Sequence, residues 1–359
     1  MQFLPDWAPN WHPLIIHFPI VLIIFGVLAD FARGIFKKAT WLNKTALFLY
    51  GGGTIFAIIA YFTGKAAADS VFFPPEGYPV VSTHADYALY TVIFLGIFFL
   101  IRAFFAYKKW DKINSWSGVL VLAGLVGVLL IQKTAEYGGM LVYKYAVGTS
   151  LQKEPSEIKP EKTTSKIPAS TINVSEDGSW LWMAQKHPLE LFHWIGLKTP
   201  KYQYADKDSQ FVKLNINTNT KVLAVLGPDL SDVQVNTEVD LTSFNGSFYL
   251  IHHFLDSSTY DFFSVGKEKI VLGRLNKGKI EMMDTKKFNQ QRRLIVKVVG
   301  TKGHFRGYVN NKLLLHGHAG DLPAGSAGFG FEGKGFIKLK YINVVSLKTK
   351  EEHGGEHAH

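Results

Sequence analysis

Three histidines in the apolar first part of the chain are the residues whose side chains are best suited to ligand chemistry. His12 and His17 lie five residues apart beside the first hydrophobic stretch, and His84 precedes the third. Neutral imidazole is the commonest nitrogen ligand for haem iron, copper and zinc. A separation of five residues is roughly 140° around a helix, so His12 and His17 cannot face one point. We expect His17 and His84 to share b-type haem or a transition metal, with His12 as helper or alternative ligand. A proton relay and a purely structural role are the other interpretations.

Four apolar stretches position these histidines. They cover residues 14–31, 45–62, 87–105 and 116–132, and each approaches the roughly 20 helical residues that cross a bilayer. Glycines within them, such as Gly51, Gly52, Gly53 and Gly124, allow helices to approach closely. These features predict a membrane-spanning all-α four-helix bundle over residues 1–148.

Basic residues between these stretches predict the orientation of the bundle. One set lies after the first stretch and consists of Arg33, Lys37, Lys38 and Lys44. The other lies after the third stretch and consists of Arg102, Lys108, Lys109 and Lys112. The long loop on the opposite side has only Lys65. The positive-inside rule places both sets in the cytoplasm. Both termini and all three histidines are then expected on the periplasmic side of a bacterial inner membrane. Residues 1–13 contain no Lys or Arg, so we expect the first helix to be retained rather than cleaved as a signal.

The overall composition excludes several classes of site. The 359 residues include no Cys, which excludes disulfides, zinc–thiolate sites, thiol nucleophiles and attached c-type haem. The net charge of +10 is concentrated partly in the short loops beside apolar stretches. We therefore attribute that charge to membrane orientation and expect no nucleic-acid partner.

The second half of the chain has the composition of an exported soluble domain. Residues 149–171 are rich in Pro, Lys, Glu, Ser and Thr, which predicts a flexible linker. Residues 172–348 alternate apolar and polar residues in short runs separated by turn sequences such as Asn245-Gly246 and Asn310-Asn311. This pattern predicts an all-β jelly-roll sandwich. The His-rich residues 349–359 are expected to form a disordered tail.

Polar side chains in this half give weaker chemical signals. His252 and His253 fall in a predicted strand, so we expect their side chains on opposite faces. His316 and His318 could share a face, but a solvated loop is the favoured interpretation. Glycoside hydrolysis needs two carboxylates at a defined separation, and the sequence does not place any pair of them. We therefore favour a binding protein over an enzyme.

The first half resembles the DUF2231 family of predicted membrane proteins over about residues 5–150. The resemblance is carried by the segment Trp11-His12-Pro13-Leu14-Ile15-Ile16-His17-Phe18-Pro19, by Thr63-Gly64, by His84-Ala85 and by the segment 138–143. It implies a four-helix membrane module with histidines in matching places. Such modules often accompany redox proteins in bacteria.

Residues 175–347 resemble concanavalin-like or laminin-G-like sandwiches. The similar segments are 260–265, 272–279, 293–300 and 305–314, together with the closing segment 325–331. Relatives of that fold include sugar-binding modules, so the resemblance implies a glycan or protein ligand. The sequence therefore favours a membrane component with a haem or metal site for electron transfer or assembly. A cofactor-free subunit of an envelope complex and a membrane-anchored glycan hydrolase are the alternatives.

Overall fold

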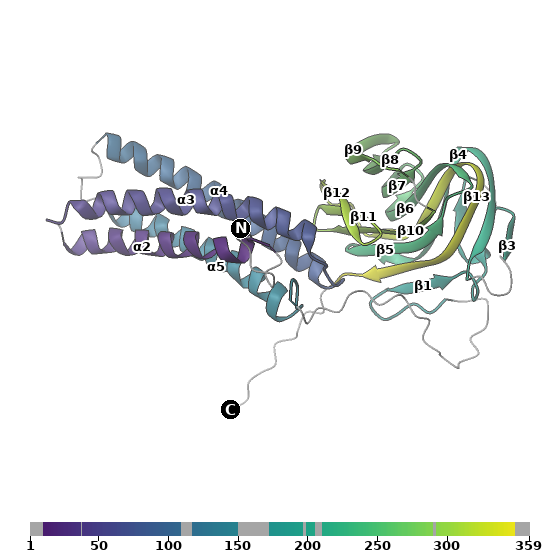
Figure 1. Ribbon diagram of the computed structural model, residues 1–359, viewed down its shortest axis with the longest axis horizontal. Coiled ribbons are helices and arrows are strands. Elements are labelled where there is room, and N and C mark those ends of the chain that lie inside the picture. The colour runs from purple at the N-terminus through teal and green to yellow at the C-terminus, as the bar shows by residue number, and fades with distance from the viewer. Residues whose placement is uncertain are drawn as a thin grey trace, which may run out of the picture. The chain divides into compact units, whose positions relative to one another are not determined.

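The computed structural model describes residues 10–36, 38–108, 117–149, 172–196, 199–204, 210–289 and 292–348. It divides the chain into two compact units, residues 1–155 and 156–359. The first unit is helical and the second is built of strands (Figure 1). The predicted linker beyond residue 149 and the predicted tail lie outside the described residues.

Four long apolar helical segments form the first unit. Each is long and apolar enough to cross a membrane, and together they span His12–Ile35, Trp41–Ser70, Gly77–Tyr107 and Gly118–Tyr143. The first is divided into α1 (His12–Ile15) and α2 (His17–Ile35), and the others are α3 (Trp41–Ser70), α4 (Gly77–Tyr107) and α5 (Ser117–Tyr143). The predicted four-helix architecture is therefore confirmed.

The helices extend beyond the apolar stretches seen in the sequence. Thr63 and Gly64 lie inside α3 rather than in a turn, and His84 lies inside α4 rather than before it. A helix can include polar residues as long as its main-chain hydrogen bonds are maintained. A search of the sequence for purely apolar runs therefore ends the helices too early.

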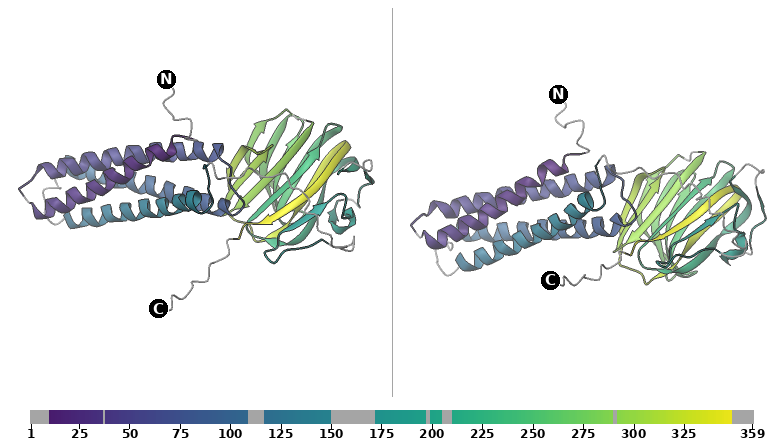
Figure 2. Two further views of the ribbon diagram at one scale, coloured as in Figure 1. Left: turned by 60° about the horizontal axis from the view of Figure 1, so that its bottom comes forward. Right: turned by 90° about the horizontal axis from the view of Figure 1, so that it is seen from below.

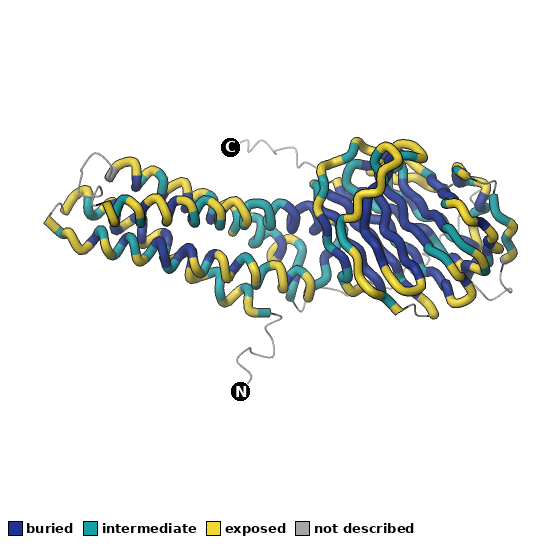
Figure 3. Tube along the Cα trace, turned by 90° about the horizontal axis from the view of Figure 1, so that it is seen from above, coloured by how far each residue is buried: buried dark blue, intermediate teal, exposed yellow. Residues whose placement is uncertain are grey.

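Small residues allow close packing around an internal aromatic ring. The main packing partners of α2 are α3 and α5, and those of α4 are also α3 and α5. Tyr50 is fully buried among residues that include Ile23, Val27 and Leu95. A β-carbon added to Gly53 would come within 2.6 Å of Ile23 Cδ1, so a larger residue cannot fit there without displacement. Many other large apolar residues of these helices, such as Phe48, Leu100 and Leu122, are exposed (Figure 3), as expected for contact with lipid.

A buried ion pair crosses the bundle between α2 and α4. Arg102 Nη1 and Nη2 donate to the carboxylate of Asp30 at 2.8 and 2.6 Å. The guanidinium also lies 5.1 Å from the ring centre of Tyr50. Arg102 was counted above among the loop residues, and this assignment is wrong because the residue belongs to α4 and is 2% exposed. A buried arginine next to a carboxylate satisfies its own charge and contributes little to the positive-inside bias.

The second unit is an antiparallel β-sandwich whose sheet runs in the order β12-β11-β10-β5-β13-β6-β7-β8-β9. Strand β4 pairs along β13, β1 pairs with β13, and β2 and β3 pair with β4. The strands are β1 (Trp180–Met183), β2 (His193–Ile195), β3 (Tyr202–Tyr204), β4 (Val212–Leu230), β5 (Val233–Asp240), β6 (Phe244–Asp256), β7 (Thr259–Gly266), β8 (Lys269–Asn276), β9 (Lys279–Lys287), β10 (Arg293–Thr301), β11 (His304–Val309), β12 (Lys312–His318) and β13 (Gly325–Ser346). A short 3-10 helix, Leu189–Leu191, precedes β2.

Strand β13 joins the layers of the sandwich. Its first part pairs with β6 from Ser326 to Gly335, and its second part pairs with β5 from Lys338 to Ser346. The layers are visible in two further orientations (Figure 2). Apolar side chains from both layers fill one core that includes Trp182, Phe248, Phe263, Phe329 and Ile342. This arrangement confirms the predicted all-β sandwich.

Candidate functional sites

His12 lies against α3 at one end of the helical unit. Its Nδ1 is 3.0 Å from the main-chain oxygen of Ala60, with Thr63 Oγ1 at 3.4 Å. Because a carbonyl only accepts, Nδ1 carries the proton and the lone pair of the neutral ring lies on Nε2. A β-carbon on Gly64 would come within 3.0 Å of His12 Cε1, so this glycine makes room for the imidazole.

His84 repeats this arrangement against α5. Its Nδ1 is 2.9 Å from the main-chain oxygen of Thr134, so the same argument places the lone pair on Nε2. A β-carbon on Gly138 would come within 3.1 Å of His84 Cε1. In both helices the accepting carbonyl lies four residues before the glycine that faces the ring. The two helix pairs therefore orient their histidines in the same way.

The structure brings His12 and His84 together. Their ring centres are 6.3 Å apart and their planes are inclined by 81°. From the sequence, His84 was paired with His17, but in the structure the imidazole that lies against the His84 ring is that of His12, and His17 is exposed. The helix pattern explains the difference, because His12 turns toward α3 while His17 lies on another side of the first segment. Nearby, Tyr137 stacks on Tyr87 with ring centres 5.5 Å apart, and Glu136 pairs with Lys133.

Donor groups of three or more side chains occur in the β-sandwich. Among the described residues, His252, His253 and Asp261 form one such group, and His304, His316 and His318 form another. The helical unit contributes none of this size within the part of the chain that the structure describes.

His252 and His253 correct an expectation from the sequence. Their Nδ1 atoms are 3.1 Å apart rather than on opposite faces of β6. His253 has a positive φ of 49°, and the register of β6 against β7 shifts between His252 and Asp256. Such a β-bulge interrupts the alternation of side chains and turns both rings to the same side.

The second histidine of this pair belongs to a buried charge network. His253 Nδ1 lies 2.9 Å from Asp261 Oδ2, and its Nε2 donates to the carbonyl of Ser231 at 3.0 Å. Arg274 Nε and Nη2 donate to the same carboxylate at 2.6 and 3.1 Å. Burial would raise the pKa of Asp261, but hydrogen bonds from His253 and Arg274 outweigh it and lower that pKa. A carboxylate occupied in this way suits a structural role better than metal binding.

His316 and His318 also differ from expectation, because they lie in strand β12 and not in a solvated loop. Their neighbour His304 was missed in the sequence, since its position depends on the pairing of β11 with β12. The His-x-His spacing marked two of the three members, and the preceding strand β11 carries the third.

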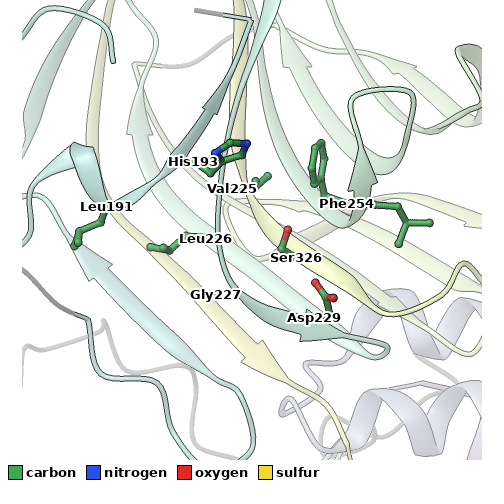
Figure 4. Close-up of a pocket in the computed structure, with 9 residues that line it drawn as sticks. Leu191, His193, Val225, Leu226, Gly227, Asp229, Phe254 and Ser326 are labelled. Carbon is green, nitrogen blue, oxygen red and sulfur yellow. The ribbon is translucent and has the colours of Figure 1, made fainter. Parts of the chain in front are cut away.

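A pocket of about 420 Å³ opens beside β2, β4 and β6 (Figure 4). Polar side chains of His193, Asp229 and Ser326 face it together with the ring of Phe254. Apolar residues, among them Leu191 and Leu226, complete its lining. A mixed lining of this kind can bind a polar ligand by hydrogen bonds and by contact with the apolar walls.

The four long apolar helices and the β-sandwich define an integral membrane protein with a separate β-domain. Residues 8–151 match the family described as "Predicted membrane protein (DUF2231)". The helical unit is therefore a domain of this membrane-protein family.

Solved structures similar to the β-sandwich come from several sources. One is the carbohydrate binding module CBM66 from Bacillus subtilis, at 13% identity over 43% of this chain and 95% of that chain, with a TM-score of 0.35. Another is Bacillus licheniformis beta-glucanase, at 7% identity over 47% and 98%, with a TM-score of 0.37. Sheep galectin-11 in complex with glycerol matches at 13% identity over 36% and 99%, with a TM-score of 0.28. The comparison with curated proteins found no match.

Proposed function

We propose that the helical unit binds haem or a transition metal ion between His12 and His84 and serves electron transfer or assembly in the membrane. The observation that carries this proposal is the matched orientation of the two imidazoles. Each holds its Nδ1 proton on a main-chain carbonyl, which is the support that metal-ligating histidines usually have. Each Nε2 is then left as a ligand.

The distance between the rings supports a shared ligand. Metal–nitrogen bonds to histidine are about 2.0–2.1 Å long, so one ion can bridge imidazoles whose centres are 6.3 Å apart. Histidine also ligates haem iron, and cofactor sites in bundles are built from side chains on facing helices, so His12 and His84 would hold a haem in the same place. When bound, such a group would supply one-electron chemistry, and this chain's residues would hold and orient it.

An absorption spectrum of the detergent-purified chain tests this proposal. A Soret band with an α band in the reduced-minus-oxidised difference would identify b-type haem. A stoichiometric metal without these bands would identify an ion instead. A colourless and metal-free preparation, even after expression with added haem precursor and metal salts, would contradict the proposal.

The pocket beside Phe254 supports a second function, the binding of a glycan by the β-sandwich. Asp229, His193 and Ser326 offer hydrogen-bonding groups around an aromatic ring, which is the chemistry that sugar hydroxyls and C–H faces require. Asp229 is the one carboxylate among the described lining residues, so the pocket supports binding better than hydrolysis by a carboxylate pair. Binding of the full chain to a glycan array should decrease in Asp229→Asn and Phe254→Ala, and unchanged binding would contradict this assignment.

We also propose that the lipid-embedded unit lies in a bacterial inner membrane with both termini and the sandwich in the periplasm. The basic residues Lys38, Lys44 and Lys108 support this orientation, and Arg102 does not contribute to it.

A further inference from the structure

Strands β11 and β12 place three imidazoles on one face of the β-sandwich. His304 and His318 are direct partners in the antiparallel register of these strands. His316 lies two residues before His318, and side chains two apart on a strand share a face. The ring centres of His304 and His318 are 4.6 Å apart, those of His316 and His318 are 4.8 Å apart, and those of His304 and His316 are 6.0 Å apart.

Tight turns at both ends of β11 hold this arrangement. Lys302 and Gly303 precede His304 with φ values of 49° and 70°, and Asn310 and Asn311 follow β11 with 51° and 62°. Consecutive positive φ values are the mark of two-residue turns that match the twist of a hairpin. The amide of Ala319 also donates to Gly303 at 3.1 Å, which joins the end of β12 to the first turn. The backbone beneath the three histidines is therefore well ordered by hydrogen bonds.

We propose that His304, His316 and His318 form a binding site for a divalent transition metal ion of the kind that prefers imidazole, such as Zn²⁺ or Cu²⁺. One ring nitrogen of each residue lies within 4.8 Å of the other two. Two nitrogen ligands of one ion are separated by up to about 4 Å, given bonds of about 2.0–2.1 Å. Small side-chain rotations therefore bring all three nitrogens to one ion.

The ligand type and number select this class of ion. Imidazole suits zinc, copper and nickel, whereas magnesium and calcium prefer oxygen ligands. Three protein ligands leave a further coordination position for water or for a ligand from solution. His318, the exposed member of the group, places one side of the site toward solvent.

Two charged residues near the three histidines have opposite effects on the binding of a cation. Arg306 is the register partner of His316, so its guanidinium lies on the same face and opposes the binding of a cation. Asp284 lies on the other side of β12, where its Oδ2 accepts a hydrogen bond from the His316 amide at 3.0 Å. The negative charge of Asp284 favours a cation beside β12, and the three imidazoles would supply the bonds through an unprotonated ring nitrogen of each.

Metal binding to the full chain tests this site directly. The background variant carries His353→Ala, His357→Ala and His359→Ala, which removes the histidines of the C-terminal segment, and His12→Ala, which removes the site proposed above in the helices. After treatment with a chelator, equilibrium dialysis against Zn²⁺ should give one tightly bound ion per chain. His318→Gln should weaken the binding at least about tenfold, since even losing a supporting group costs 10- to 100-fold.

The matched control is His193→Gln, which changes an exposed histidine of the same domain outside the cluster. It should leave Zn²⁺ affinity unchanged, and circular dichroism should show that His318→Gln keeps the fold. With Co²⁺ as the probe, visible d–d absorption should be present in the background variant and absent when His304, His316 and His318 are all replaced by Gln. Equal Zn²⁺ binding with and without the three histidines, or no tight Zn²⁺ in the background variant, would overturn the proposal.

Discussion

Burial is the main cause that lowers the pKa of His252 from an ordinary value of 6.5 to about 3; the neighbouring His253 and Arg274 contribute in the same direction, and Asp261 opposes them. The imidazole stacks on Phe305 with ring centres 5.8 Å apart, and its Nε2 has no hydrogen-bond partner among the described residues. This side chain is therefore neutral in the folded protein throughout the physiological range. Because the unfolded chain can protonate this imidazole more readily than the folded chain can, the stability of the fold depends on pH.

We predict that the β-sandwich loses stability as the pH falls below 6.5. Between pH 6.5 and about 3 the unfolded chain binds a proton that folded His252 does not, so the free energy of unfolding decreases with decreasing pH. At pH 5 the loss from this residue is about 2 kcal/mol. The lowered pKa of Asp261 adds a loss in the same direction at lower pH, below its ordinary value of 3.8.

Urea unfolding of the full chain in detergent, followed by tryptophan fluorescence at pH 7 and pH 5, measures this effect. His252→Leu should flatten the dependence on pH, while His193→Leu, at an exposed position, should leave it unchanged. An equally steep dependence in His252→Leu would show that another group is responsible.

At the scale of the helices, glycines set the space for the paired histidines. A β-carbon added to Gly138 would lie 3.1 Å from His84 Cε1. The atom nearest to a β-carbon added to Gly139 is Tyr143 Cδ2, at 3.9 Å. We predict that Gly138→Val displaces the imidazole and lowers haem or metal occupancy at least severalfold, and that Gly139→Val does not. Occupancy per chain is the measurement, with helical circular dichroism as the control for folding. Equal occupancy in the two variants would argue against ligation by His84.

The ion pair between α2 and α4 gives a second prediction at this scale. Asp30→Asn leaves the buried guanidinium of Arg102 without its anion and should destabilise the bundle by about 3–5 kcal/mol. The double variant Asp30→Leu, Arg102→Met should be much less destabilised, because both charges are removed together. Thermal unfolding in detergent compares the two. A double variant as unstable as the single one would show that the pair contributes more than mutual neutralisation.

Sequence patterns predicted the architecture of this protein well because it depends on the distribution of apolar and polar residues over long segments. Four apolar runs specified four helices, and alternation with turn sequences specified a β-sandwich over residues 172–348. The ends of the helices were predicted less well, since Gly64 and His84 continue helices that hydropathy alone ends earlier. Arg102 was misplaced for a different reason: it was counted with the loop although it lies within the third apolar stretch, 87–105.

The candidate sites were predicted less completely because they depend on the backbone torsion angles of single residues and on the register between strands. The turn of His253 into a left-handed conformation brings two rings together, which alternation along β6 would forbid. His304 joins His318 only through the pairing of β11 with β12. In the bundle, the sequence identified all three histidines, but only packing against Ala60 and Thr134 distinguishes His12 from His17 as the neighbour of His84.

At the scale of the whole molecule, the proposed orientation makes a prediction about access. The chain has no cysteine, so single cysteines can report on each side of the membrane. A membrane-impermeant maleimide should label Lys279→Cys in the exposed strand β9 on intact spheroplasts, and should label Lys38→Cys only after the membrane is permeabilised. The reverse pattern would place the sandwich in the cytoplasm and contradict the orientation.

The most direct test of the account is the haem and metal content per chain of His84→Ala compared with that of His17→Ala. Ligation between His12 and His84 predicts that the first variant loses the bound group and that the second, altered at an exposed histidine of the same unit, retains it. Retention in His84→Ala, or an equal loss in both variants, would contradict the claim that this pair of imidazoles holds the group.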